Sequence, residues 1–329
     1  MPIVGTFRLR GIGRNLHSGC GFLGGSLLHL VRSYWPSLLL LAGIWGGSYL
    51  FIKVAVEDIP PAAMTEIRVL VAGILLAGFL ALRTGARRSV HELRAAWKPC
   101  VVLGTINAAL PMSLVAWGET RIDSNVAAIA QASVPIFVVL LSLRFLPHEP
   151  LGPTRIAGLV VGLVGVALIT GAHPESGAWA ALGTLAVVLS SVSYASGGVY
   201  GQLQVKGTLG PVLAAGSMLA AAIILLPFAI ADPPVDAPGA TAVAGLIALI
   251  LLPTVLGQLL LFRMLRLFGS RRMSLVTYLL PGFALVYGAL LLDEPITAIA
   301  LGGLALILGG VALASGQRIL GPRLHEEAA

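Results

Sequence analysis

Residues 35–56 read WPSLLLLAGIWGGSYLFIKVAV, and this stretch decides the fold class. It carries a single charged side chain, Lys53, which lies near the end of the run and is expected to extend toward the lipid headgroups. A helix of roughly 20 apolar residues crosses about 30 Å of hydrocarbon. The pair Trp35-Pro36 suits an interfacial anchor followed by the first helical turn. We therefore predict that 35–56 crosses a membrane.

Nine further apolar runs of similar length follow this one. Hydrophobic residues make up 57% of the 329 positions and charged residues 11%, whereas soluble proteins carry roughly 25% charged residues. Too few charges are present to cover a water-facing surface. The sequence predicts an all-α integral membrane protein with ten transmembrane helices. The expected spans are 35–56, 61–82, 100–117, 124–145, 153–171, 177–200, 209–230, 240–265, 273–292 and 297–315.

The basic residues give an independent test of this topology. With both termini in the cytoplasm, inner segments hold 18 of the 21 Lys and Arg residues, including the basic loop 83–98. The outer loops hold only Arg121, while Lys53 and Arg68 lie within spans. Cytoplasmic loops attract Lys and Arg. We expect a multi-pass protein of a bacterial plasma membrane, and the net charge of +7 follows from topology rather than from a nucleic-acid-binding domain.

Two segments outside the spans are expected to be cytoplasmic tails, 1–34 and 318–329. For the first, a surface-lying helix, a disordered arm and an over-long start of the reading frame all stay open. Cys20 and Cys100 both fall on the predicted cytoplasmic side, where a disulfide is not expected. The sequence offers no metal-ligand spacing and no cofactor motif, so no metal and no cofactor are expected.

Sequence features repeat at a distance of about 145 residues. Gly165-Val-Ala-Leu returns as Gly310-Val-Ala-Leu, and Glu149-Pro150 returns as Glu294-Pro295. An odd number of helices in each half makes the halves enter the membrane from opposite sides, as in the inverted repeats of secondary transporters. The predicted halves are 35–173 and 177–317. The prolines Pro111 and Pro253, and likewise Pro135 and Pro281, occupy corresponding positions.

These residues carry a family resemblance. They are the run 41–53 (LAGIWGGSYLFIK), Pro61 followed by Arg68, Pro135 before Arg144 and Glu149, and Pro281 before Glu294-Pro295. Across about 35–317 the chain resembles the drug/metabolite transporter (DMT) superfamily, EamA type. The resemblance implies a ten-helix carrier with a central cavity between inverted halves, usually exporting amino acids, related metabolites or toxic compounds. One departure is that 145–149 (FLPHE) is a residue longer than 291–294 (LLDE), and the N-terminal tail lies outside the match.

Polar side chains inside spans are the candidate substrate-binding and cavity residues, because burying them in a membrane is costly. Trp45, Ser48 and Tyr49 share one side of the first span and could contact a substrate, or could pack between helices beside Gly46-Gly47. Arg68 is expected either to bind an anion or to form a structural pair. The complete set is Trp45, Ser48, Tyr49, Arg68, Asn107, Gln131, Tyr194, Thr277 and Tyr278.

Four prolines are predicted to kink their helices: Pro111, Pro135, Pro253 and Pro281. A helical proline leaves the carbonyl four residues earlier without its N–H donor. Inside a bilayer that carbonyl needs a neighbouring group, a water molecule or a substrate. Asn107, Gln131 and Thr277 stand four residues before three of these prolines and would enlarge such sites. The alternative is a kink whose backbone is satisfied by packing alone.

The function predicted from these features is secondary or facilitative transport of small molecules by alternating access. Glu66 is the one acidic residue expected well inside a span, so any proton coupling is expected to use it. The alternative is that Asp293 or Glu294 folds back into the cavity. An intramembrane enzyme and a non-transporting membrane protein are the rival classes, but no catalytic residues are expected. The expected partners are a small-molecule substrate and the lipid bilayer, and a homodimer is among the assemblies that the sequence allows.

Overall fold

A computed structural model describes residues 33–145, 152–170, 177–204, 208–268 and 276–315. These residues form helices with short connections and contain no strand. Helix is the expected solution, because hydrocarbon offers no partner to backbone N–H and C=O groups. In chain order the elements are α2 (Tyr34–Ala55), α3 (Pro61–Thr84), α4 (Ala86–Ala95), α5 (Trp97–Gly104), the π-helix η1 (Thr105–Ala109), α6 (Leu110–Glu119), α7 (Ser124–Gln131), α8 (Val134–Phe145), α9 (Pro153–Thr170), α10 (Gly177–Gln204), α11 (Gly210–Ala231), α12 (Ala240–Leu249), the π-helix η2 (Ile250–Leu256), α13 (Gly257–Phe268), α15 (Val276–Leu291) and α16 (Ala298–Ser315).

Apolar helical segments of the described chain stand at all ten predicted spans. Seven are long and apolar enough to cross a membrane, and shorter apolar helices lie at Ile156–Leu168, Leu279–Leu291 and Ala298–Leu313. The three shorter ones belong to α9, α15 and α16, which are the fifth, ninth and tenth spans. The prediction of an all-α integral membrane fold is confirmed.

The structure corrects three details of the predicted spans. Part of the expected basic loop forms α4, where Arg88 Nε donates a hydrogen bond to Glu92 Oε1 over 2.8 Å. The third span continues to Glu119 instead of ending at residue 117. The fourth span is not one helix, because α7 ends at Gln131 and α8 starts three residues later, at Val134. Pro135, the second residue of α8, favours this break since it lacks the N–H that a continuous helix would use.

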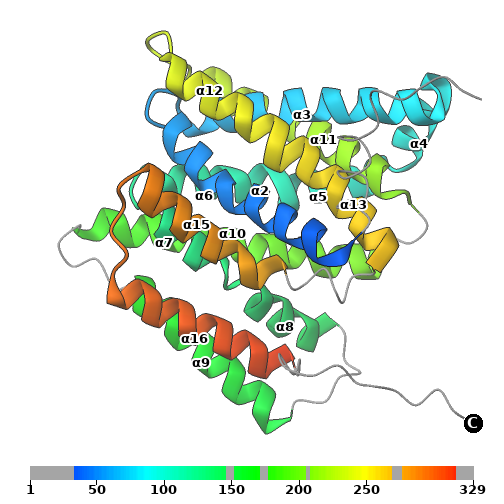
Figure 1. Ribbon diagram of the computed structural model, residues 1–329. Coiled ribbons are helices and arrows are strands. Elements are labelled where there is room, and N and C mark those ends of the chain that lie inside the picture. Colours follow the sequence, from blue (N-terminus) through cyan, green and yellow to red (C-terminus); the bar gives the residue numbers. More distant parts are fainter. Residues whose placement is uncertain (1–32, 146–151, 171–176, 205–207, 269–275, 316–329) are drawn as a thin grey trace, which may run out of the picture.

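Corresponding helices of the two halves make equivalent packing contacts. The first span α2 packs on α15 and α12, and its counterpart α10 packs on α7, α8 and α6 (Figure 1). The second spans α3 and α11 pack on each other, and so do the fifth spans α9 and α16. This reciprocity is that of a two-fold relation and agrees with the inverted repeat. The predicted boundary between the halves and both predicted tails fall largely outside the described residues, so their limits stay predictions.

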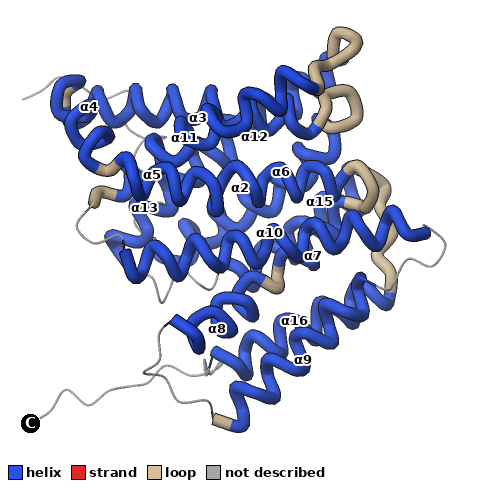
Figure 2. Tube along the Cα trace, turned by 180° about the vertical axis from the view of Figure 1, so that it is seen from behind, coloured by secondary structure: helices blue, strands red, loops and turns tan. Residues whose placement is uncertain are grey.

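Close backbone contact joins α9 to α16, which lie side by side at one edge of the molecule (Figure 1, Figure 2). A Cβ atom added at Gly310 would lie 2.5 Å from the amide nitrogen of Gly162, and one at Gly165 would lie 2.9 Å from the carbonyl oxygen of Gly303. Small residues allow helices in membranes to approach so closely. The repeated glycines at 165 and 310 thus lie at the contact between the two repeats.

Candidate functional site

Four polar side chains from four helices gather in the protein interior, and we call them the Arg68 cluster: Tyr49 on α2, Arg68 on α3, Glu119 on α6 and Tyr194 on α10. Arg68 interacts electrostatically with the other three, and Tyr49 interacts with both Glu119 and Tyr194. Arg68 is 7% exposed and Glu119 is fully buried. The structure thus brings together three of the predicted site residues, drawn from both halves, and adds one that was not predicted.

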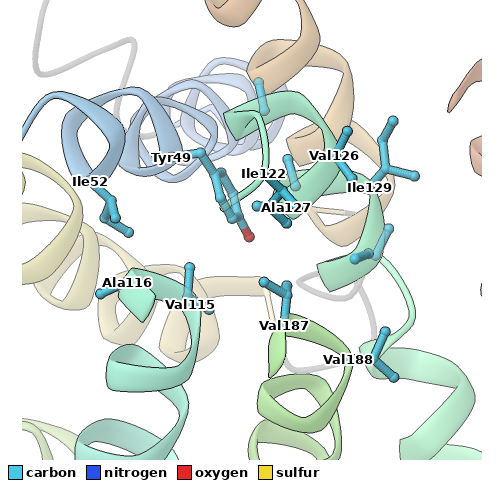
Figure 3. Packing of buried hydrophobic residues seen from close by; sticks show 14 of the residues in the cluster. Tyr49, Ile52, Val115, Ala116, Ile122, Val126, Ala127, Ile129, Val187 and Val188 are labelled. Atoms are coloured by element: carbon cyan, nitrogen blue, oxygen red, sulfur yellow. The ribbon is translucent and has the colours of Figure 1, made fainter. Parts of the chain in front are cut away.

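Apolar side chains surround Tyr49, the α2 member of the cluster. Figure 3 shows Tyr49 reaching from α2 toward Val115 and Ala116 on α6, with Val187 of α10 beyond its hydroxyl group. All four residues belong to one buried hydrophobic core. Such surroundings exclude water and strengthen electrostatic interactions among the polar groups.

Arg68 connects the two halves of the chain. Its Nε atom donates a hydrogen bond to Oγ1 of Thr254 on η2 over 2.9 Å. The hydroxyl of Thr254, in turn, donates to the carbonyl oxygen of Leu249 over 2.8 Å. Pro253 lacks the N–H that would serve this carbonyl in a regular helix. The proline therefore exposes a carbonyl, and the threonine both satisfies it and orients Arg68.

The two π-helical segments accept hydrogen bonds in equivalent ways. Trp45 Nε1 on α2 donates to the carbonyl oxygen of Pro253 in η2 over 3.1 Å. Ser193 Oγ on α10 donates to the carbonyl oxygen of Ile106 in η1 over 2.7 Å. In both cases a side chain on the first span of one half donates to the π-helical backbone of the other half. Pro111, the second residue of α6, stands two residues after the end of η1. Single π turns occur frequently at functional sites.

Gln131, the last residue of α7, forms a second polar point between the halves. Its Oε1 atom accepts a hydrogen bond from Ser190 Oγ of α10 over 2.6 Å. Its Nε2 atom is buried and has no hydrogen-bond partner among the described residues. A buried donor without a partner is costly. Asn107 contacts the same helix, since a Cβ atom at Gly197 would lie 2.8 Å from its Oδ1.

The structure describes the remaining predicted site residues to different extents. Ser48 donates its hydroxyl hydrogen to the carbonyl of Trp45, within its own helix. Thr277 lies on α15 one turn before Pro281, and the helix continues through that proline. The side chain of Tyr278 lies outside the described part of the structure.

Glu66 is not the only acidic residue that the helices bury. Glu119, expected in an outer loop, is the last residue of α6 and is 0% exposed. Neither of its carboxylate oxygens has a hydrogen-bond partner among the described residues. Glu66 is buried as well, and its Oε2 atom lacks a partner. Sequence reasoning missed Glu119 because the apolar run stops at Trp117, one half-turn before the helix does.

Lys53 links α2 to the end of α6 by hydrogen bonds. The expectation that it extends toward the lipid headgroups is wrong. Its Nζ atom donates hydrogen bonds to the carbonyl oxygens of Glu119, over 3.0 Å, and Ile122, over 2.8 Å. A cation is favourable at the C-terminus of a helix, where carbonyl groups are unpaired. Lys53 therefore closes the turn between α6 and α7.

Glu294 caps α7 from the far end of the chain. Asp293 has a left-handed backbone (φ 54°), a conformation that Asp tolerates, and this turn precedes the buried Glu294. The Oε1 atom of Glu294 accepts from the backbone N–H of Ser124 over 2.7 Å, and Oε2 accepts from the N–H of Asn125 over 3.0 Å. A carboxylate is favourable at a helix N-terminus. Its repeat counterpart, Glu149, lies outside the described residues.

Two apolar grooves lie at the surface of the helices, and none of the predicted site residues lines either one. The first, of about 580 Å³, lies between α2, η2 and α15, and the second, of about 700 Å³, lies between α3, α6, α10 and α11. Exposed side chains such as Leu39 and Phe228 line them. The grooves are therefore separate from the Arg68 cluster.

The described helices define an integral membrane protein whose two halves bury polar groups where they meet, which is the architecture of secondary transporters. Two successive stretches, residues 33–171 and 181–316, match the model of the EamA-like transporter family, and the chain belongs to this family.

Curated relatives are named as transporters. The chain is 31% identical over 192 residues to the uncharacterized inner membrane transporter YedA of Escherichia coli (strain K12), and this match covers 58% of the chain and 60% of YedA. It is 27% identical over 271 residues to the uncharacterized transporter YoaV of Bacillus subtilis, covering 82% and 91% of the two chains. It is 30% identical over 307 residues to a probable terminal-alkyne amino-acid exporter of Streptantibioticus cattleyicolor, covering 90% and 97%.

A solved crystal structure shares the fold. The two chains superpose with a TM-score of 0.60 at 21% sequence identity, over 84% of this chain and 95% of the other. The fold is therefore shared with a protein of distant sequence.

Proposed function

We propose that the chain is a secondary or facilitative transporter that exports small metabolites, amino acids and related toxic compounds in particular, by alternating access. Membership of the EamA-like transporter family supports transport, and one relative is named as a probable amino-acid exporter. The Arg68 cluster carries the proposal, because it places a buried cation beside two phenol groups between the halves. Both termini are proposed to be cytoplasmic, in the plasma membrane of a bacterium.

The chemistry of the cluster suits a carboxylate-bearing substrate. The planar guanidinium of Arg68 matches a carboxylate group, and Tyr49 presents an aromatic ring and a hydroxyl beside it. Gln131 adds an amide donor that has no partner among the described residues. Because Arg68 and Gln131 contact residues of the opposite half, movement of the halves would alter the site and its access together.

Transport into and out of proteoliposomes tests this proposal. Vesicles containing the purified full-length chain are loaded separately with L-propargylglycine, L-threonine or the cationic dye ethidium, and release is compared with that from protein-free vesicles. Propargylglycine is chosen because it is a terminal-alkyne amino acid and can be detected by coupling to an azide dye. We expect faster release of at least one amino acid. Release of no amino acid would refute the proposed substrate class.

Variants at the site separate binding from packing. Gln131→Ala and Tyr49→Phe, which keeps the buried ring and removes only the hydroxyl, should slow release while the melting temperature stays near that of the wild type. Leu182→Ala, an exposed residue in the second groove, is the control and should transport normally. Normal rates in both site variants would show that these side chains only pack.

A further inference from the structure

We propose that Glu119 binds the proton that couples transport to a pH gradient, and that its protonation controls the closure made by Lys53. The proposal rests on the proposed function and deepens it, by naming the coupling ion and the group that carries it. It replaces Glu66, which the sequence favoured for this role.

The burial of Glu119 carries the first step. The residue is 0% exposed, and neither Oε1 nor Oε2 has a hydrogen-bond partner among the described residues. An ionised carboxylate without partners in a protein interior costs several kcal/mol, whereas a protonated one costs far less. The arrangement therefore fits the neutral acid. Glu294 differs, because its carboxylate accepts hydrogen bonds from Ser124 and Asn125 and so suits the charged form.

Charged and titratable groups face Glu119 from the elements around it. Glu119 interacts electrostatically with Lys53 on α2, with Arg68 on α3 and with Glu294 in the connection before α16. Tyr49 and Tyr194, which interact with Arg68, complete the surroundings, and Glu66 and Asp123 lie on the neighbouring elements α3 and the α6–α7 turn. Two cations are thus within reach of the carboxylate once its proton has left.

Lys53 supplies the link from protonation to conformation. An ammonium group has three N–H donors, and two of them bind the carbonyl oxygens of Glu119 and Ile122. The ammonium thus already lies beside the residue whose carboxylate it would neutralise. Moving from the carbonyl of Ile122 to that carboxylate would release the turn that leads into α7.

The proposed step is a simple acid dissociation. When water from the cytoplasmic side reaches Glu119, the O–H bond of its carboxyl group breaks, the proton passes to that water and the carboxylate pairs with Lys53. The bond from Lys53 to the Ile122 carbonyl is lost, and the end of the bundle that the proposed topology makes external opens. Protonation of the carboxylate from that side reverses both changes. Each cycle thereby carries one proton across the membrane for each substrate.

Infrared difference spectroscopy tests the proton site without any substrate. Spectra of the purified full-length chain, recorded while the pH is changed, should contain the C=O stretching band of a buried carboxylic acid. Glu66 is a second buried acid, so Glu119→Gln should remove a component of this band that the matched variant Glu66→Gln retains. A band that Glu119→Gln leaves unchanged would overturn the proposal, and so would a wild type without such a band.

A transport measurement tests the coupling. A gradient of about one pH unit supports about tenfold accumulation at one proton per substrate. Wild-type proteoliposomes should reach that accumulation of L-propargylglycine. Glu119→Gln resembles the protonated acid and keeps the external end closed, so it should accumulate none, whereas the matched variant Glu66→Gln should accumulate as the wild type does. Full accumulation by Glu119→Gln would refute the proposal. Accumulation that is driven by a Na⁺ gradient and not by a pH gradient would assign the carboxylate to Na⁺ instead. If the wild type moves neither L-propargylglycine nor L-threonine, the substrate class fails while the infrared result still decides the role of Glu119.

Discussion

Replacing Thr254 by Val removes the hydroxyl that joins the two halves, with little change in side-chain shape. Two hydrogen bonds are lost, the one from Arg68 Nε at 2.9 Å and the one to the Leu249 carbonyl at 2.8 Å. A hydrogen bond to a charged group contributes about 1.5–3 kcal/mol and a neutral one about 0.5–1.5 kcal/mol. Side-chain hydrogen bonds between membrane helices measure lower, about 0.6 kcal/mol on average and about 1.7 kcal/mol at most. We therefore expect Thr254→Val to lower the free energy of unfolding by about 2 kcal/mol.

Reversible unfolding in mixed micelles is the assay, and a control isolates the bond between the halves. Thr65→Val removes a hydroxyl that bonds only to the Pro61 carbonyl of its own helix, so we expect a loss below about 0.5 kcal/mol. A double-mutant cycle of Thr254→Val with Arg68→Met should give a coupling energy of about 1–2 kcal/mol. Equal losses for Thr254→Val and Thr65→Val, together with no coupling to Arg68, would refute the reasoning.

Two further predictions follow from the packing and the topology. Gly310→Ala places a methyl group 2.5 Å from the Gly162 nitrogen and should lower the free energy of unfolding by about 1–3 kcal/mol. The neighbouring Gly309→Ala meets no atom within 4 Å and should leave it unchanged. Similar melting temperatures for both variants would show that α9 and α16 do not pack so closely. On a background without Cys20 and Cys100, a cysteine at Asp236 should react with an impermeant reagent outside the cell and one at Glu92 should not; labelling at position 92 from outside would invert the proposed topology.

The features set by the bilayer could be read from the sequence. Hydrocarbon imposes the length and apolarity of each span, so runs such as 35–56 mark the helices by themselves. The glycines at 165 and 310 indicate the repeat in the sequence, because each must leave room for the backbone of the other half. Arg68, Tyr49 and Tyr194 were found because polar groups inside spans are costly and therefore informative.

The features set by contacts between distant segments could not be read. Glu119 and Glu294 stand at the ends of apolar runs, where an acidic residue usually faces water, and their burial depends on tertiary packing. Glu294 is held by Ser124, 170 residues earlier in the chain. The π-helical segments could not be predicted from the sequence for a related reason. Pro111 and Pro253 predict an interruption, but two donors that bond the π-helical backbone, Ser193 and Trp45, come from the other half.

Access to Gln131 from the two sides of the membrane is the most direct test of transport by alternating access between the two halves. A single cysteine at position 131, on the background without Cys20 and Cys100, is exposed to an impermeant thiol reagent in right-side-out and in inside-out vesicles. The account predicts reaction from both sides, with rates that change in opposite directions when L-propargylglycine is added. Reaction from one side only, whatever the substrate, would contradict it.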